Sequence, residues 1–205
     1  MLTALLAFAA ASALLVLLPG PDTLIVLRSV VLHGRRRAAR VALGVLTGLS
    51  IWIVAAALGI TALLRASHDG YLALRLVGAV YLIYIGIQSL RSRTLGQSVE
   101  HQPPRFSLLG STFRGGLLTD LLNPKVGVFF ITFLPAFIPH RAPVATTTLA
   151  MGAIFAIEGT IYFAALLLFV DRLTAWLGRE RIRRRLNRAT GLVFIGFGLR
   201  LATEG

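Results

Sequence analysis

The sequence predicts an all-α membrane protein of six transmembrane helices, arranged as two inverted three-helix repeats with broken first and fourth helices. Three observations lead to this fold class. The 205 residues are 56% hydrophobic and only 14% charged, whereas soluble domains carry about 25% charged residues. Basic residues gather in alternate gaps between apolar segments. Prolines interrupt two of these segments at corresponding positions.

Six apolar segments approach or exceed the roughly 20 residues that a membrane span requires. We expect these spans at Leu2–Val31 (broken at Pro19–Pro21), Val41–Leu64, Leu72–Leu90, Phe113–Ile138 (broken at Pro124), Val144–Val170 and Ala189–Thr203. The gaps leave no room for a separate soluble domain. The chain is therefore expected to be one membrane domain over 1–205. Its first repeat is 1–96, its linker is 97–104, and its second repeat is 105–205.

The charged residues predict an orientation. All but one of the 21 basic residues are arginine, and the net charge is +13. Arginines concentrate in the first, third and fifth gaps, at His33–Arg40, Arg91–Thr112 and Asp171–Arg188. Short basic loops remain cytoplasmic, so both termini should lie outside. This placement favours membrane lipids over nucleic acid as the partner of the charge. Apolar residues at helical spacing in the fifth gap predict a separate helix on the membrane surface.

The first break carries polar side chains inside an apolar segment. It reads Pro19-Gly20-Pro21-Asp22-Thr23. Pro19 and Pro21 have no backbone N–H, so they free the carbonyls of Leu15 and Leu17. In hydrocarbon these carbonyls must find partners within the protein. We therefore expect the break to line a cavity; the alternative is a packing kink with Asp22 as a cap.

The second half repeats this pattern. Asn123-Pro124-Lys125 in the fourth span echoes the first break, and Arg188 to Gly191 echoes Arg75 to Gly78. Each half contains an odd number of spans, so the second half is inverted relative to the first. Inverted repeats with broken helices at matching positions indicate a binding site near the membrane midplane.

A charged residue inside a membrane span costs about 2.5–3.5 kcal/mol, and four charged residues of the expected spans are candidates for function. They are Asp22, Asp120, Lys125 and Glu158. Asp120 shares a helix face with Asn123, and Glu158 lies one turn from Tyr162. Two structural alternatives stay open: an Asp120–Lys125 ion pair, and Glu158 as a buried partner of Lys125.

The spacing of Gly44 and Gly48 in the second span permits a close helix contact. The neighbouring helix could belong to the same half of the chain or to the other half.

Other chemistry has little support in the sequence. Cysteine is absent, so disulfides, thiolate metal sites and cysteine nucleophiles are excluded. All four histidines fall outside the apolar segments. We therefore expect no metal, no cofactor and no enzymatic activity. An intramembrane enzyme that uses the three acids for acid–base catalysis stays as an alternative.

Three motifs in this order resemble the LysE/RhtB family of amino-acid exporters. They are Pro19-Gly20-Pro21-Asp22, then Gly78 to Gly86 (GAVYLIYIG), then Asn123-Pro124-Lys125 followed by Phe129-Phe130 and Phe133-Leu134-Pro135. The resemblance covers nearly the whole chain. It implies a six-span exporter of amino acids or related metabolites in the bacterial inner membrane, driven by a proton or sodium gradient. It also implies a homodimer.

Under this interpretation, Lys125 and the N-termini of the half-helices hold a substrate carboxylate, and an acid holds the ammonium. Three acids against one lysine favour protonating one acid, which provides a route to proton antiport. Sodium coupling, with a substrate other than an amino acid, is the alternative. The candidate substrate-binding residues are Pro19, Gly20, Pro21, Asp22, Thr23, Asp120, Asn123, Pro124, Lys125 and Tyr162. The candidate residues for the coupling ion are Glu158, Asp22 and Asp120.

Overall fold

The computed structural model describes residues 1–66, 68–91, 111–139, 142–170, 172 and 179–203. This part of the chain is helical and contains no strand. Its helices are α1 (Leu2–Leu17), α2 (Pro21–His33), α3 (Arg35–Ala66), α4 (His68–Arg91), α6 (Phe113–Leu121), α7 (Pro124–Val128), the π-helical turn η2 (Phe129–Phe133), the 3-10 turn η3 (Leu134–Phe137), α8 (Val144–Leu168) and α10 (Glu180–Thr203). The expected linker 97–104 lies outside the described residues.

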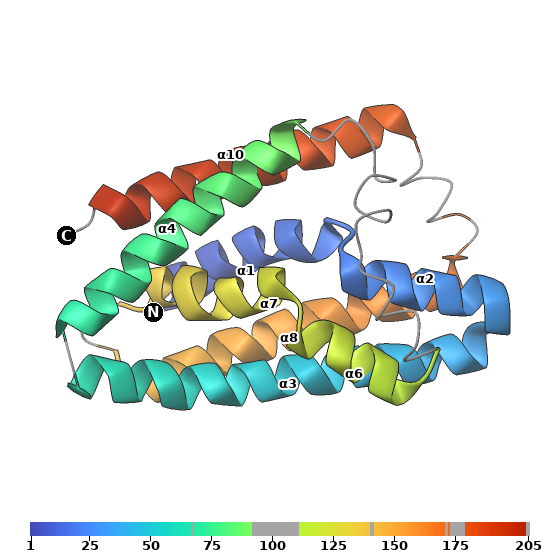
Figure 1. Ribbon diagram of the computed structural model, residues 1–205, viewed down its shortest axis with the longest axis horizontal. Helices are drawn as coiled ribbons and strands as arrows, with labels where there is room; N and C mark the ends of the chain where they lie inside the picture. Colours follow the sequence, from blue (N-terminus) through green and yellow to red (C-terminus); the bar gives the residue numbers. More distant parts are fainter. Residues whose placement is uncertain (67, 92–110, 140–141, 171, 173–178, 204–205) are drawn as a thin grey trace.

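The helices run lengthwise along the molecule, and α4 and α10 lie side by side along one edge (Figure 1). Below them, α1 and α8 pack together, and α3 packs against α6 and α8. The N-terminus and the C-terminal end of α10 lie toward the same end of the molecule, and the turn between α2 and α3 lies at the other end.

Length and composition support between two and four membrane spans in the described residues. Two straight helices qualify, over Arg35–Gly59 and Val144–Leu168. Two bent pairs qualify if each counts as one span: α1 with α2, bent by 47°, and α6 with the segment Pro124–Phe137, bent by 49°. In α4 the apolar stretch Leu76–Arg91 is too short to qualify as a span, and α10 begins with an arginine-rich stretch. The all-helical membrane fold is confirmed, whereas the full six-span repeat stays a prediction.

Two basic segments differ from the expectation. His33–Arg40 is not a loop, because α2 ends at His33 and α3 begins at Arg35. The connection is Gly34 alone, at φ +78°, a left-handed conformation that glycine adopts at little cost. In the fifth gap, Glu180 starts α10, and the arginines that follow belong to the same helix as the expected sixth span. Because α10 is continuous, the arginines from residue 181 onward are not in a separate surface helix; residues 173–178 lie outside the described part.

Glycines bring helices of the two halves into backbone contact. A Cβ on Gly44 of α3 would lie 2.0 Å from the Phe113 carbonyl oxygen of α6, and one on Gly116 of α6 would lie 2.1 Å from the Val41 oxygen. The spacing of Gly44 and Gly48 therefore packs α3 against the other half, not within its own. Gly86 of α4 and Gly191 of α10 approach each other in the same way: a Cβ on either glycine would lie 2.8 Å from the carbonyl oxygen of the other.

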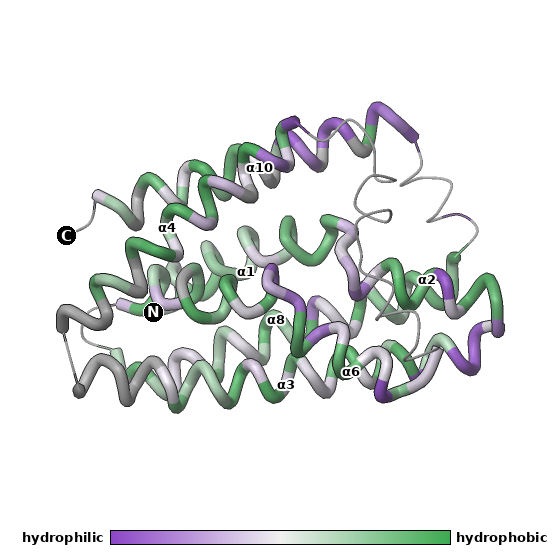
Figure 2. Tube along the Cα trace, viewed as in Figure 1, coloured by the Kyte–Doolittle hydropathy of each residue, from purple (hydrophilic) through white to green (hydrophobic). Residues whose placement is uncertain are grey.

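Hydrophilic residues cluster at the end of the molecule that holds the α2–α3 turn and the start of α10 (Figure 2). We predict that this end is cytoplasmic. A reporter fused after Gly205, or inserted at 68–70, should report outside, and a reporter in 96–101 should report inside. Signals from the same side for Gly205 and 96–101 would contradict the inverted repeat.

Candidate functional site

The two helix breaks meet at one cavity of about 60 Å³. Its polar lining comes from the start of α2, the end of α6, the start of α7 and the middle of α8. The polar lining residues are Asp22, Thr23, Asp120, Asn123, Lys125 and Tyr162, and Gly20 also lines the cavity. All seven belong to the predicted substrate-binding set. The remaining members, Pro19, Pro21 and Pro124, shape the breaks instead of lining the cavity.

Lys125, which belongs to the second break, bonds to the backbone at the first break. Its Nζ donates to the carbonyl oxygens of Leu15 at 3.0 Å and Leu18 at 2.9 Å. The Leu15 carbonyl is the one that Pro19 frees from its helical hydrogen bond. The ammonium therefore caps the C-terminal end of α1, where the helix dipole places partial negative charge.

Lys125 forms no ion pair with an acid. Among the described residues one ion pair is present, between Arg184 and Glu180 at the start of α10. The two structural alternatives, Lys125 paired with Asp120 or with Glu158, are therefore wrong. The reason is geometric: α7 begins beside the end of α1, so the ammonium reaches backbone carbonyls first.

Asn123 connects the two breaks through both ends of its amide. Its Nδ2 donates to Asp22 Oδ2 at 2.6 Å. Its Oδ1 accepts from the backbone N–H of Lys125 at 3.0 Å and so caps α7. Asn123 is 3% exposed, and a buried amide that satisfies both partners fixes their relative positions.

Asp120 lies against α3. Its carbonyl, freed by Pro124, accepts from Trp52 Nε1 at 3.3 Å and from the backbone N–H of Asn123 at 3.0 Å. A Cβ on Gly48 would lie 2.7 Å from Asp120 Oδ2. Asp120 Oδ2 and Asp22 Oδ1 are buried and receive no hydrogen bond. Two of the residues that line the cavity therefore each have a buried carboxylate oxygen that lacks a donor.

Glu158 lies apart from this cavity. It does not line the cavity, although the next residue, Gly159, does. Its Oε2 accepts from the Ser12 hydroxyl at 2.7 Å, which joins α8 to α1. Tyr162, one turn later, donates to Thr23 Oγ1 at 3.3 Å. The sequence did not indicate Ser12, because a single serine in an apolar helix is typical of close packing. It did not indicate Trp52 as a hydrogen-bond donor, because an aromatic side chain within a span is also typical of packing.

The cavity is too small for an amino acid in this structure. Its volume is about 60 Å³. Ligand sites commonly measure about 300–1,000 Å³. A ligand of that size does not fit the cavity in this structure, where the bonds of Lys125 and Asn123 join the two helix breaks.

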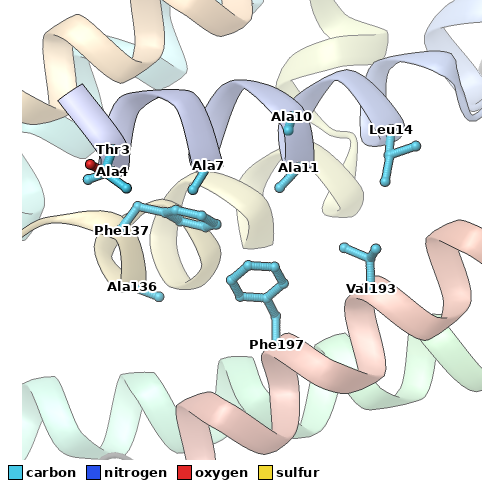
Figure 3. Close-up of a pocket in the computed structure, with 10 residues that line it drawn as sticks. All are labelled: Thr3, Ala4, Ala7, Ala10, Ala11, Leu14, Ala136, Phe137, Val193 and Phe197. Atoms are coloured by element: carbon cyan, nitrogen blue, oxygen red, sulfur yellow. The ribbon is translucent and has the colours of Figure 1, made fainter.

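A larger hollow of about 450 Å³ lies between α1, η3 and α10. Figure 3 shows its alanine-rich α1 wall facing Phe137 and Phe197. Its one polar side chain is Thr3, and it contains no charged residue. It therefore lacks the groups needed to bind a zwitterion.

Two broken helices that bring charged side chains together inside an apolar helical bundle are the arrangement found in membrane carriers. The chain belongs to the LysE family: the model for the LysE type translocator matches residues 13–205.

Named relatives match over nearly their full length. The uncharacterized membrane protein YrhP of Bacillus subtilis is 26% identical over 96% of this chain and 97% of its own. The homoserine/homoserine lactone efflux protein of Salmonella typhi is 30% identical, with coverage of 96% and 95%. The leucine efflux protein of Salmonella typhimurium is 30% identical, with coverage of 92% and 90%. No solved structure matches the chain with comparable significance.

The breaks themselves can be tested. We expect Pro21→Ala and Pro124→Ala to insert at normal abundance but to reduce transport at least tenfold, because restoring each helix removes backbone groups from the site. Export from cells, normalised to membrane abundance, measures this. Pro143→Ala, at an exposed position before α8, is the matched control. Normal export by both test variants would reduce the breaks to packing kinks.

Proposed function

We propose that this chain is a secondary transporter of the bacterial inner membrane that exports amino acids or closely related metabolites by proton antiport. One observation carries the proposal: the two breaks meet around a cavity whose charged groups a zwitterion could engage. The relatives named as leucine and homoserine efflux proteins support it. These names also favour transport over an intramembrane enzyme.

The substrate carboxylate binds at the start of α2. That helix has Gly20 as its N-cap and no side-chain cap, so its first N–H groups are available to an anion. A Cβ on Gly20 would lie 3.7 Å from Lys125 Nζ, which places the ammonium beside this helix end. The carboxylate replaces the Leu15 and Leu18 carbonyls as the partner of Lys125, and the first break opens.

The substrate ammonium binds to Asp22 and Asp120. Their oxygens Oδ1 and Oδ2, respectively, are buried without donors, and a primary ammonium offers three donors. Buried carboxylate oxygens without partners are costly, so ammonium binding stabilises the open site.

Proton coupling uses one of three acids. Glu158 is the principal candidate for the proton carrier, and Asp22 and Asp120 are the other candidates. Glu158 lies between α8 and α1 through its bond to Ser12, so gain of a proton changes how these helices are joined. Sodium coupling has less support. The Asp120 carbonyl, which could coordinate sodium, already accepts from Trp52 and from the backbone N–H of Asn123.

The proposal includes six spans in two inverted repeats, 1–96 and 105–205, with both termini outside.

Export from cells loaded with individual amino acids, screened across a panel, tests the function. We expect faster export of at least one amino acid than from cells that lack the protein. Equal rates for every compound, with the protein present in the membrane, would contradict it.

Glu158→Gln keeps the side-chain shape and an acceptor for Ser12 but removes ionisation. We expect this variant to insert and to catalyse substrate counterflow in reconstituted vesicles, while gradient-driven export falls at least tenfold. Glu180→Gln, at an exposed acid, is the control. Loss of counterflow as well would make Glu158 a substrate ligand, and unimpaired gradient-driven export would remove it from the mechanism.

A further inference from the structure

The cavity has an apolar side that the proposed mechanism does not use. Val45 and Leu49 of α3 line it, as do Phe155 and Gly159 of α8. Each pair is spaced by four residues and therefore shares one helix face. Leu49 is 4% exposed and Phe155 is 6% exposed, so this apolar side lies inside the protein and does not face lipid.

Gly159 leaves space at this side. A Cβ at this position would lie 3.7 Å from the Cδ2 atoms of Leu46 and Leu49, which is ordinary van der Waals contact. A methyl group therefore fits without displacing α3. A larger side chain would occupy the space between Leu49 and α8, so glycine here keeps room for another apolar group.

The charges of the site are fully used by the backbone of an amino acid. The charged residues that line the cavity are Asp22, Asp120 and Lys125. Two acids and one lysine leave a net charge of −1, which protonation of one acid removes. The substrate ammonium then pairs with the remaining carboxylate, and the substrate carboxylate pairs with the lysine. Glu158 bonds to Ser12 and does not line the cavity. Nothing remains to pair with a charged side chain, and an unpaired charge there would be strongly disfavoured.

Building on the proposed function, we infer that the exported amino acid has an uncharged, apolar side chain, which binds between Leu49 of α3 and the Phe155–Gly159 face of α8. This inference defines the substrate class and identifies Gly159 as the residue that limits side-chain size. Larger residues at 159 shorten the space available to the substrate side chain.

Counterflow in proteoliposomes containing the full chain tests the substrate class. We expect exchange of labelled leucine to be competed by leucine, valine and alanine, and to be unaffected by lysine or glutamate at equal concentration. Strong exchange of lysine or glutamate without leucine would overturn the inference and leave the exporter intact. Absence of exchange with every amino acid would instead contradict the proposed function.

Variants at Gly159 test the position of the side chain. We expect Gly159→Val to lower the leucine-to-alanine rate ratio by about 10–200-fold, the range for a misfitting methylene in an apolar pocket, with alanine exchange retained. Gly159→Ala should have a smaller effect in the same direction. Gly196→Val, in open space on α10, is the control. An unchanged ratio in both Gly159 variants overturns the assignment; should the valine variant fail to insert, the alanine variant decides.

Discussion

Replacing Lys125 with methionine is expected to reduce export by about a hundredfold while the protein still reaches the membrane. The change removes the donor to the Leu15 and Leu18 carbonyls and the proposed partner of the substrate carboxylate. Hydrogen bonds to charged groups contribute about 1.5–3 kcal/mol each, and about 1.4 kcal/mol corresponds to a tenfold change in affinity. Two such bonds to the substrate carboxylate correspond to about 3–6 kcal/mol, or at least about two orders of magnitude.

The measurement is the initial rate of export from cells, divided by the amount of protein in the membrane. Arg28→Met is the matched control, because Arg28 is a cationic residue on α2 that is exposed. It should leave export within about twofold of the wild-type rate, since an exposed charge contributes little. Export by Lys125→Met at the Arg28→Met rate would remove Lys125 from the site.

Asn123→Asp is expected to have the second largest effect, a loss of export of at least about tenfold together with lower thermal stability in detergent. The substitution keeps the acceptor for the Lys125 N–H but replaces the donor that contacts Asp22 Oδ2 at 2.6 Å. Two carboxylates then face each other in a buried site, where like charges repel strongly.

The reciprocal double variant Asp22→Asn with Asn123→Asp separates structure from transport. It restores one amide and one carboxylate across the same contact, so thermal stability should recover toward the wild-type value. Export should stay low, because the substrate ammonium has lost Asp22. Equal stability of Asn123→Asp and wild type would show that the contact does not join the two breaks.

The sequence predicts the breaks well because proline acts locally. Pro19 frees the Leu15 carbonyl whatever the rest of the chain does, and a freed carbonyl in an apolar span requires an internal partner. The partner itself could not be predicted. Lys125 is 110 residues from Leu15, and only packing of α7 beside the end of α1 brings them together.

Contacts between the halves were less accessible to sequence reasoning. Gly44 and Gly48 indicate a close helix contact but do not identify the neighbouring helix, which is α6. Ser12 carries no signal, since its role depends on α8 placing Glu158 beside α1. The arginines after Glu180 resemble a surface segment in composition, yet continue directly into α10, because nothing in that stretch ends a helix.

Uptake of a labelled amino acid into inside-out membrane vesicles tests the central claim most directly. With the vesicle interior made acidic in sodium-free buffer, protons leaving through the carrier should drive accumulation of the amino acid inside. We predict accumulation above that of vesicles without the protein, and its collapse when a protonophore dissipates the gradient. Accumulation that requires sodium would contradict proton antiport, and uptake no greater than in control vesicles for every amino acid would contradict the exporter itself.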